Sequence, residues 1–353
     1  MRRARWKGNR EAAVAHYHCL SRVVDRRFAL GEDEKEHFIR LMRGYEAFCG
    51  VRVVTYCIMS NHFHVLVEVP KRPPPELLPN DRELVCLLRK ARYSYGAAEL
   101  KQNLARFRKE GQDAAAGELR ERFFARMWDV SWFMRLLKQR FTQWFNKRHG
   151  REGTLWQERF RSVLVEGAGP ALATMAAYID LNPVRAGMTS DPKKYRWSGY
   201  GEAAGGRRRA REGLRVAVEA LRGRAVVPQR VMAEYRIYVY ESGEKRDLGG
   251  NGEKGRRGFS REEIQEVLAT GGQLELADAL RCRVRYFCDG AVMGSRAFVD
   301  EFFETHREWF GPRRRSGARR LRGIKTRSLF VLRGLRVRPL GGPSRKNTLD
   351  FLG

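Results

Sequence analysis

The fold is decided by the stretch VRVVTYCIMSNHFHVLVEV, residues 51–69. Its two ends, residues 51–58 and 62–69, are rich in β-branched and aromatic residues, which favour strands. Only the short turn Met59-Ser60-Asn61 separates them. The stretch therefore predicts two consecutive strands of one sheet.

The sequence before this stretch adds a strand and a helix. Residues 16–22 have strand composition, and residues 33–48 place apolar side chains at helical spacing. The order strand, helix, strand, strand opens a ferredoxin-like sheet. We expect an α+β fold with a ferredoxin-like (RRM-like) antiparallel sheet, packed helices and a helical, basic C-terminal extension.

Composition shifts divide the chain further. Five prolines between residues 70 and 79 end the strand pattern, and residues 71–130 are expected to form a helical insertion within a domain of residues 1–200. A helix over 131–149, a strand over 160–166 and a helix over 170–182 complete that domain. Beyond it we expect a basic, Gly-rich linker (201–258), a small helical accessory region (259–310) and a poorly ordered basic tail (311–353).

The accessory region carries two helix signals. Ser260 and Glu263 have the spacing of a capping box, and a second helix is expected over 295–310. The helices around Cys288 and Arg296 resemble a helix-turn-helix, which would make this region an additional DNA binder. The alternative is a small helical appendage that only adds charge.

The charge points to a polyanionic partner. The chain of 353 residues has 70 Lys and Arg against 41 Asp and Glu, a formal net charge of +29. Such an excess favours nucleic acid, because each neutralised phosphate releases counterions. No long apolar run or signal peptide is present, so we expect no membrane partner. The six cysteines form no CxxC pair and fit a reducing cytoplasm.

Two histidines stand out on the last strand. Strand side chains alternate between faces, so His62 and His64 point the same way and Phe63 points into the opposite core. Two imidazoles converging from one strand suit a divalent metal ion. A merely solvated pair of histidines is the alternative for this motif taken alone.

A tyrosine on the helix over 170–182 strengthens the metal interpretation, because Tyr178 and Asn182 are four residues apart and share a helix face. Together with MSNHFHVLV (59–67), the segment YIDLNPVRAG (178–187) closely resembles the REP-associated tyrosine transposases of the HUH superfamily. GTLWQERF (153–160) and YRWSGY (195–200) extend the resemblance over most of residues 14–200.

The resemblance implies a metal-dependent nuclease and strand-transferase that cuts single-stranded DNA at palindromic hairpins. Tyr178 would be the nucleophile that forms a 5′-phosphotyrosine. His62 and His64 would bind Mg²⁺ or Mn²⁺, with Asn182 as third ligand. Such a protein would act as a monomer or homodimer in the bacterial cytoplasm, near the nucleoid.

Three acidic residues and one proline complicate this site. Pro183 disfavours helical geometry at Asn182, which could instead cap a following helix. Asp180 is expected to be a surface carboxylate, while Glu68 and Glu166 are spare ligand candidates.

Basic and aromatic residues near these motifs are candidates for DNA contacts, because arginines clamp phosphates and a tryptophan can stack on unpaired bases. They are Arg22, Arg26, Arg27, Trp156, Gln157, Arg159, Arg161 and Arg185. For Trp156, simple core packing is the alternative.

Two other functions compete with transposition. A domesticated, non-catalytic protein that binds DNA or RNA hairpins would use the same basic surface, but it would need neither the histidine pair nor Tyr178. A replication or conjugation initiator of the same superfamily fits less well, because the chain has no P-loop pattern.

Overall fold

A central sheet organises the computed structural model, which describes residues 12–91, 94–241, 274–276, 280, 286–321, 324–326 and 328–333. Within these ranges the sheet has seven strands in the order β2-β3-β1-β4-β6-β9-β7. The strands are β1 (Val14–Arg22), β2 (Arg52–Ile58), β3 (His62–Pro70), β4 (Arg161–Val165), β6 (Val292–Gly294), β7 (Arg319–Arg320) and β9 (Phe330–Leu332). A separate parallel pair joins β5 (Leu274–Glu275) to β8 (Ile324–Lys325).

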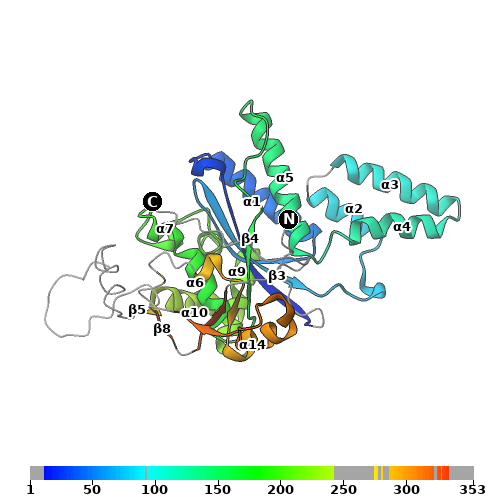
Figure 1. Cartoon of the computed structure of the whole chain (residues 1–353). Helices are drawn as coiled ribbons and strands as arrows, with labels where there is room; N and C mark the ends of the chain where they lie inside the picture. The colour runs from blue at the N-terminus through cyan, green and yellow to red at the C-terminus, as the bar shows by residue number, and fades with distance from the viewer. Residues whose placement is uncertain are drawn as a thin grey trace.

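Helices cover both faces of the sheet (Figure 1). The longer ones are α1 (Glu32–Phe48), α2 (Asp81–Lys90), α3 (Ser94–Lys109), α4 (Asp113–Phe124), α5 (Val130–Arg148), α6 (Pro170–Asp180), α9 (Arg208–Arg222), α10 (Pro228–Glu241) and α14 (Arg296–Thr305). Shorter ones are α7 (Asn182–Arg185), α8 (Gly199–Ala204) and α13 (Tyr286–Asp289).

The first four strands have the predicted ferredoxin-like arrangement. β3 pairs antiparallel with both β2 and β1, and β1 pairs antiparallel with β4. Because α1 connects β1 to β2 with β3 between them, the unit is a split β-α-β. The α+β, ferredoxin-like fold class is confirmed.

Side-chain alternation along β3 creates two hydrophobic cores. Phe63, fully buried, joins the core under α1 and α5, where its ring lies 4.6 Å from that of Phe38. Leu66 joins the core on the opposite face, under α6 and α9. His64 is two residues from Leu66 on the strand and therefore points to the same face, beneath α6.

Close packing of α9 on β2 depends on Gly213. A Cβ at this position would lie 2.4 Å from the Val53 carbonyl oxygen and 2.7 Å from that of Val54. These are backbone atoms of a paired strand, so they cannot move without disturbing the sheet. The glycine lets the helix and sheet backbones approach closely.

The region after residue 200 departs from the predicted linker. Residues 199–241 contain α8, α9 and α10, whose apolar side chains Leu214, Val218 and Tyr235 are buried. The linker prediction is therefore wrong for residues 201–241, because the basic composition hid an amphipathic pattern that packs on the sheet. The Gly-rich stretch 242–258 and the capping box at Ser260 lie outside the described residues.

The C-terminal region also differs from the predicted helical extension. β6 pairs parallel with β4, and β9 and β7 continue the sheet beyond it. Since β6 lies between α13 and α14, the helix-turn-helix prediction is wrong. Residues 319–320, 324–325 and 330–332 form strands, so the prediction of a poorly ordered tail from residue 311 is wrong for these segments. Residues 322–323, 327 and 334–353 lie outside the described residues.

Candidate active site

The two predicted histidines lie on the face of β3 that α6 covers. Register pairs His62 with Arg22 of β1 and His64 with Leu20. Their ring centroids are 5.2 Å apart, with planes inclined by 78°. His62 is half-buried at the start of the strand, whereas His64 is only 3% exposed. As the alternation predicted, both imidazole rings point to one face of the sheet, and Phe63 points to the other.

A third histidine, His18 of β1, contacts His64. His18 Nε2 lies 2.8 Å from His64 Nδ1, and His18 Nδ1 lies 2.7 Å from the carbonyl oxygen of Phe287 in α13. Burial lowers the pKa of His18 to about 4, and burial also lowers the pKa of His64 well below its usual value. Both imidazoles are therefore neutral near pH 7.

The side chain of Tyr178 packs on this histidine pair. Its ring centroid lies 6.2 Å from that of His64 and 6.4 Å from that of His18, both edge to face. The phenol oxygen is 3.2 Å from Cys288 Sγ, and the Phe287 ring centroid is 4.7 Å from the tyrosine ring. With 2% of its surface exposed, Tyr178 is enclosed by the sheet and α13.

Arg185 of α7 lies over the other side of this tyrosine. Its guanidinium carbon is 4.1 Å from the Tyr178 ring centroid, a cation–π contact. The guanidinium also donates to the carbonyl oxygens of Tyr178 and Leu280, each at 2.6 Å. Arg185, predicted as a DNA contact, is thus already engaged in orienting the tyrosine helix.

Asn182 begins a separate short helix. α6 ends at Asp180, and Leu181 is the residue that precedes α7, with no side-chain cap. The capping alternative for Asn182 is therefore not adopted. Its Nδ2 atom is buried without a hydrogen-bond partner among the described residues. A 180° rotation of the amide exchanges the positions of its nitrogen and its oxygen, so either atom can occupy this buried position. The side chain is therefore a polar group that a ligand could satisfy.

The groups that could hold a divalent ion here are two imidazoles and an amide, those of His62, His64 and Asn182. Within the described residues, no group of three or more His, Cys, Asp and Glu side chains is arranged to hold a metal. His62 Nδ1 lies 2.6 Å from Asn61 Oδ1, and His64 Nδ1 faces His18. Such hydrogen bonds orient metal-binding imidazoles, whose Nε2 atoms then serve as ligands.

The two spare carboxylates are used elsewhere. Glu68 accepts a hydrogen bond from Arg52 at 2.7 Å and lies 3.4 Å from His16 Nε2. Glu166 accepts hydrogen bonds from the backbone nitrogen and hydroxyl of Ser295. The prediction of these carboxylates as spare ligands finds no support, because each is engaged in holding strands or helices together.

Asp180, predicted as a surface carboxylate, is fully buried. It accepts hydrogen bonds from Thr55 of β2 at 2.9 and 3.0 Å, from Tyr235 of α10 at 2.5 Å and from the Tyr200 backbone nitrogen at 3.3 Å. The prediction was wrong because α8 and α10 cover this side of α6. The carboxylate therefore fixes the helix that carries Tyr178 to three other elements.

Asp180 should make stability depend on pH. Burial raises its pKa from 3.8 to about 7, so the folded protein holds a proton that the unfolded chain releases. The wild type should lose up to about 4 kcal/mol through this group as the pH rises from about 4 to about 7. Urea unfolding of wild type and Asp180→Asn across this range measures the difference; parallel pH profiles would contradict the buried, protonated carboxyl.

Several predicted DNA-contact residues lie beside the histidines. The Gln157 backbone nitrogen donates to the carbonyl oxygen of Arg22 at 3.0 Å, next to His62. Arg161 pairs with Leu20, which in turn pairs with His64. Arg161 therefore lies in the same row across β4, β1 and β3. Arg26, Arg27 and Arg159 are exposed near the same strand ends.

Trp156 is a core residue and not a surface for stacking bases. It is 6% exposed and packs edge to face on Phe63 at 5.3 Å, while its indole nitrogen donates to the Lys138 carbonyl oxygen. The neighbouring arginines suggested nucleic acid, but the aromatic cluster under α5 takes the ring. The core-packing alternative is the one that the structure adopts.

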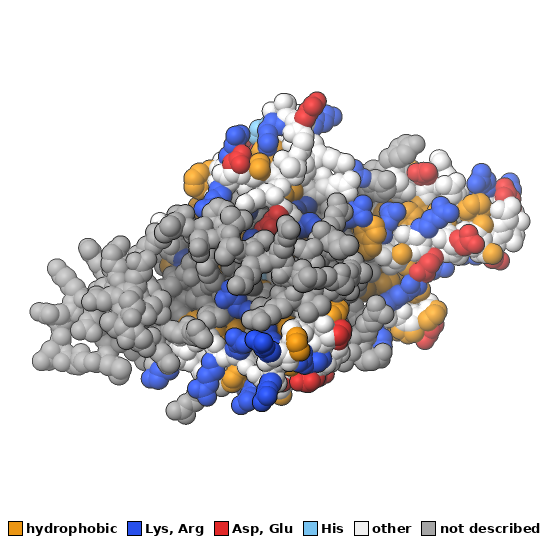
Figure 2. Space-filling model, viewed as in Figure 1, with side chains coloured by type: hydrophobic (Ala, Val, Ile, Leu, Met, Phe, Trp, Pro, Cys, Tyr) orange, Lys and Arg blue, Asp and Glu red, His pale blue; other side chains and the backbone are white. Residues whose placement is uncertain are grey.

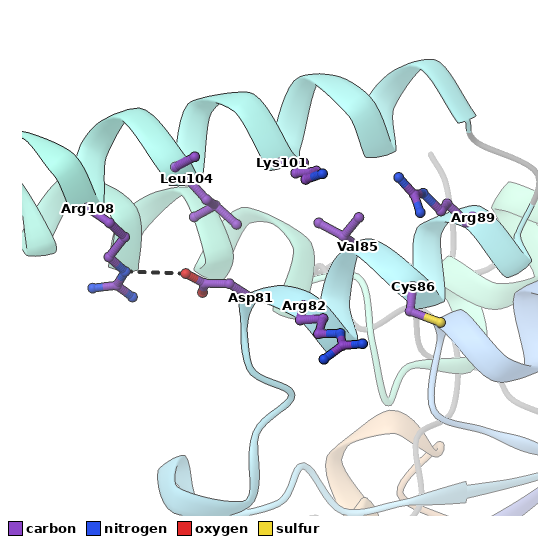
Figure 3. A pocket seen from close by; sticks show the side chains of 9 residues that line it. Asp81, Arg82, Val85, Cys86, Arg89, Lys101, Leu104 and Arg108 are labelled. Atoms are coloured by element: carbon purple, nitrogen blue, oxygen red, sulfur yellow. Dashed lines mark hydrogen bonds and ion pairs between the residues drawn. The ribbon is translucent and has the colours of Figure 1, made fainter.

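Basic side chains are not confined to this site. Figure 2 shows Lys and Arg over several described parts of one face, including the arm formed by α2–α4. In that arm a groove of about 600 Å³ separates α2 from α3 (Figure 3). Val85 and Leu104 lie at its apolar part, and Arg108 pairs with Asp81 at 3.2 Å. None of its lining residues comes from β1, β3 or α6.

Comparison with known proteins finds a family similar to the N-terminal part of the chain. The family model described as "Transposase IS200 like" matches residues 12–78, which include β1, α1, β2 and the histidine strand. Residues 12–78 are similar to the IS200-like transposases. The predicted resemblance to the tyrosine transposases is thereby confirmed. Among curated proteins, none matches.

A solved structure is also similar to part of the chain. It is described as "Structure of the REP associates tyrosine transposase bound to a REP hairpin". The match has 14% identity and a TM-score of 0.34, and it covers 58% of this chain and 85% of the other. Separately, no helix in the described ranges is long and apolar enough to cross a membrane.

Proposed function

We propose that the protein is a metal-dependent endonuclease and strand-transferase that acts on single-stranded DNA with hairpins. Tyr178 is the nucleophile, and His62, His64 and Asn182 are the ligands of Mg²⁺ or Mn²⁺. The observation that carries this proposal is the contact of Tyr178 with His64, with ring centroids 6.2 Å apart. The IS200-like segment that contains both histidines supports it.

The reaction is an in-line displacement at phosphorus. The Tyr178 oxygen forms a bond to phosphorus while the bond to the 3′ oxygen breaks, so a 5′-phosphotyrosine and a free 3′-hydroxyl result. The phenol loses its proton, and the leaving oxygen gains one. A bound divalent ion supplies stabilisation of the charge that grows on the non-bridging oxygens. Because the phosphotyrosine retains the energy of the broken ester, a second hydroxyl can reverse the attack.

DNA must displace part of α13 to reach the tyrosine. Tyr178 is 2% exposed, and Phe287 and Cys288 lie against its ring and its hydroxyl. Burial of an unbound nucleophile protects it from water, but a phosphate cannot approach it in this arrangement. The proposal therefore includes movement of these two residues when the hairpin binds.

The direct test is formation of a covalent protein–DNA adduct. Single-stranded DNA from the region flanking the gene is labelled within the fragment whose 5′ phosphate would become linked to the tyrosine. It is incubated with the protein and with Mg²⁺, Mn²⁺ or a chelator. A labelled band that survives denaturation and depends on metal is expected. Binding without any adduct, under every metal condition, would instead favour a non-catalytic hairpin-binding protein.

Arg161 should contact a phosphate near the cut site, because it shares a sheet row with His64. Arg161→Ala is expected to weaken hairpin binding and to lower the slope of log affinity against log salt by about one. The matched control is Arg208→Ala, whose side chain is 92% exposed on α9 and pairs with Glu212. Equal salt slopes for wild type and Arg161→Ala would exclude the phosphate contact.

A further inference from the structure

A chain of hydrogen bonds runs from the C-terminal region to the metal-binding face. The carbonyl oxygen of Phe287 lies 2.7 Å from His18 Nδ1, and His18 Nε2 lies 2.8 Å from His64 Nδ1. His18 and His64 are 1% and 3% exposed. Because these groups are enclosed, the donor and the acceptor of each hydrogen bond can be worked out from the first acceptor.

The first acceptor is the Phe287 carbonyl oxygen, which can accept a hydrogen bond but cannot donate one. His18 Nδ1 must therefore carry a proton and donate it to Phe287. A neutral His18 then has a lone pair on Nε2, so His64 Nδ1 must be the donor in the second hydrogen bond. A neutral His64 with its proton on Nδ1 keeps its lone pair on Nε2. That is the form that can bind a metal.

Burial favours this arrangement over the charged one. If His18 carried a second proton, its Nε2 would donate to His64, and the proton of a neutral His64 would lie on Nε2, where it blocks a metal. An enclosed imidazolium hydrogen-bonded to another imidazole, with the two ring planes inclined by only 15°, has a high desolvation cost.

We propose that His18 is a positioning residue for metal binding: anchored by the Phe287 carbonyl, it holds His64 in the Nδ1–H tautomer and so presents His64 Nε2 as a ligand. The role of His18 in metal binding rests on the proposed function. The tautomer itself is a property of the metal-free protein. It also gives the C-terminal region a role in the site, although residues 18 and 287 are far apart in the sequence.

Two variants separate positioning from simple packing. His18→Gln keeps an oxygen that can accept from His64 Nδ1, whereas His18→Leu fills similar space without an acceptor. Both are compared by thermal unfolding with the wild type, so that loss of fold is recognised. The Leu variant removes the hydrogen bond, and the Gln variant serves as its rescue.

The readout is the tautomer of each histidine in metal-free protein, measured by nitrogen NMR on histidine-labelled samples near pH 7.5. The wild type and His18→Gln are expected to show His64 as Nδ1–H, and folded His18→Leu to show it largely as Nε2–H. Mn²⁺ affinity should fall by about 10- to 100-fold in His18→Leu and much less in His18→Gln.

The outcomes keep this inference apart from the proposed reaction. An Nε2–H tautomer of His64 in the wild type, or an unchanged Nδ1–H tautomer in folded His18→Leu, would overturn the positioning role. The expected tautomers combined with no Mn²⁺ binding and no adduct would retain the hydrogen-bond chain and reject the metal-dependent reaction.

Discussion

Tyr178→Phe is expected to abolish both strand cleavage and the covalent adduct, while hairpin binding stays close to that of the wild type. The substitution removes the attacking oxygen but keeps the ring that packs on His64, Phe287 and the Arg185 guanidinium. The lost contact to Cys288 is a weak hydrogen bond, so stability should change by about 1 kcal/mol or less. A denaturing gel of labelled hairpin DNA measures the loss.

Tyr195→Phe provides the matched control for this experiment. Tyr195 is also a buried tyrosine, but its hydroxyl donates to the Ile58 carbonyl oxygen at 2.7 Å. This variant should still form the adduct. Peptide mapping must place the wild-type adduct on Tyr178; an adduct on Tyr195 or Tyr200, or cleavage by Tyr178→Phe, would show that the nucleophile is another group.

His62→Ala and His64→Ala should each lower the cleavage rate by about 10³-fold or more, because stabilisation of the phosphoryl charge by the metal is worth several kcal/mol. Hairpin affinity should change only a few-fold, since the basic surface supplies most of it. His62 lies at the strand end and is half-buried, so its variant should fold normally. His64→Ala also leaves His18 Nε2 without its partner, which should lower the melting temperature.

A control histidine distinguishes metal binding from general effects of removing an imidazole. His149 lies 3.0 Å from Glu34 at the end of α5. His149→Ala should keep cleavage and its dependence on Mn²⁺. Near-normal cleavage by both His62→Ala and His64→Ala would refute the ligand assignment, and unchanged Mn²⁺ affinity in both would do so without reference to activity.

Local patterns were sufficient for the first part of the fold. The alternation along residues 62–69 placed Phe63 in one core and both histidines on the other face, because a strand has a period of two whatever surrounds it. The helices at 32–48 and 130–148 followed from apolar spacing in the same way. These features depend only on residues that are close together in the sequence.

Composition misled the prediction where packing decided the outcome. The basic residues of 201–241 suggested a linker, yet α9 buries Leu214 and Val218 against the sheet. Trp156 stood among arginines but joined the aromatic core, and Asp180 lay on a helix whose second side is covered by α8 and α10. A single residue's surroundings depend on elements distant in the chain, and no periodicity reports them.

The sequence by itself determined the ferredoxin-like unit, the shared face of His62 and His64, and the candidate nucleophile Tyr178. Only the tertiary structure decided what surrounds them. The second pair of the same pattern, His16 and His18, was visible in the sequence, but its link to His64 required the β1–β3 register. The enclosure of Tyr178 by α13 required β6 to pair with β4. These contacts join residues 46 positions apart for His18 and His64 and 110 apart for Tyr178 and Cys288. They form only when burial of apolar surface offsets the entropy of closing the chain between them.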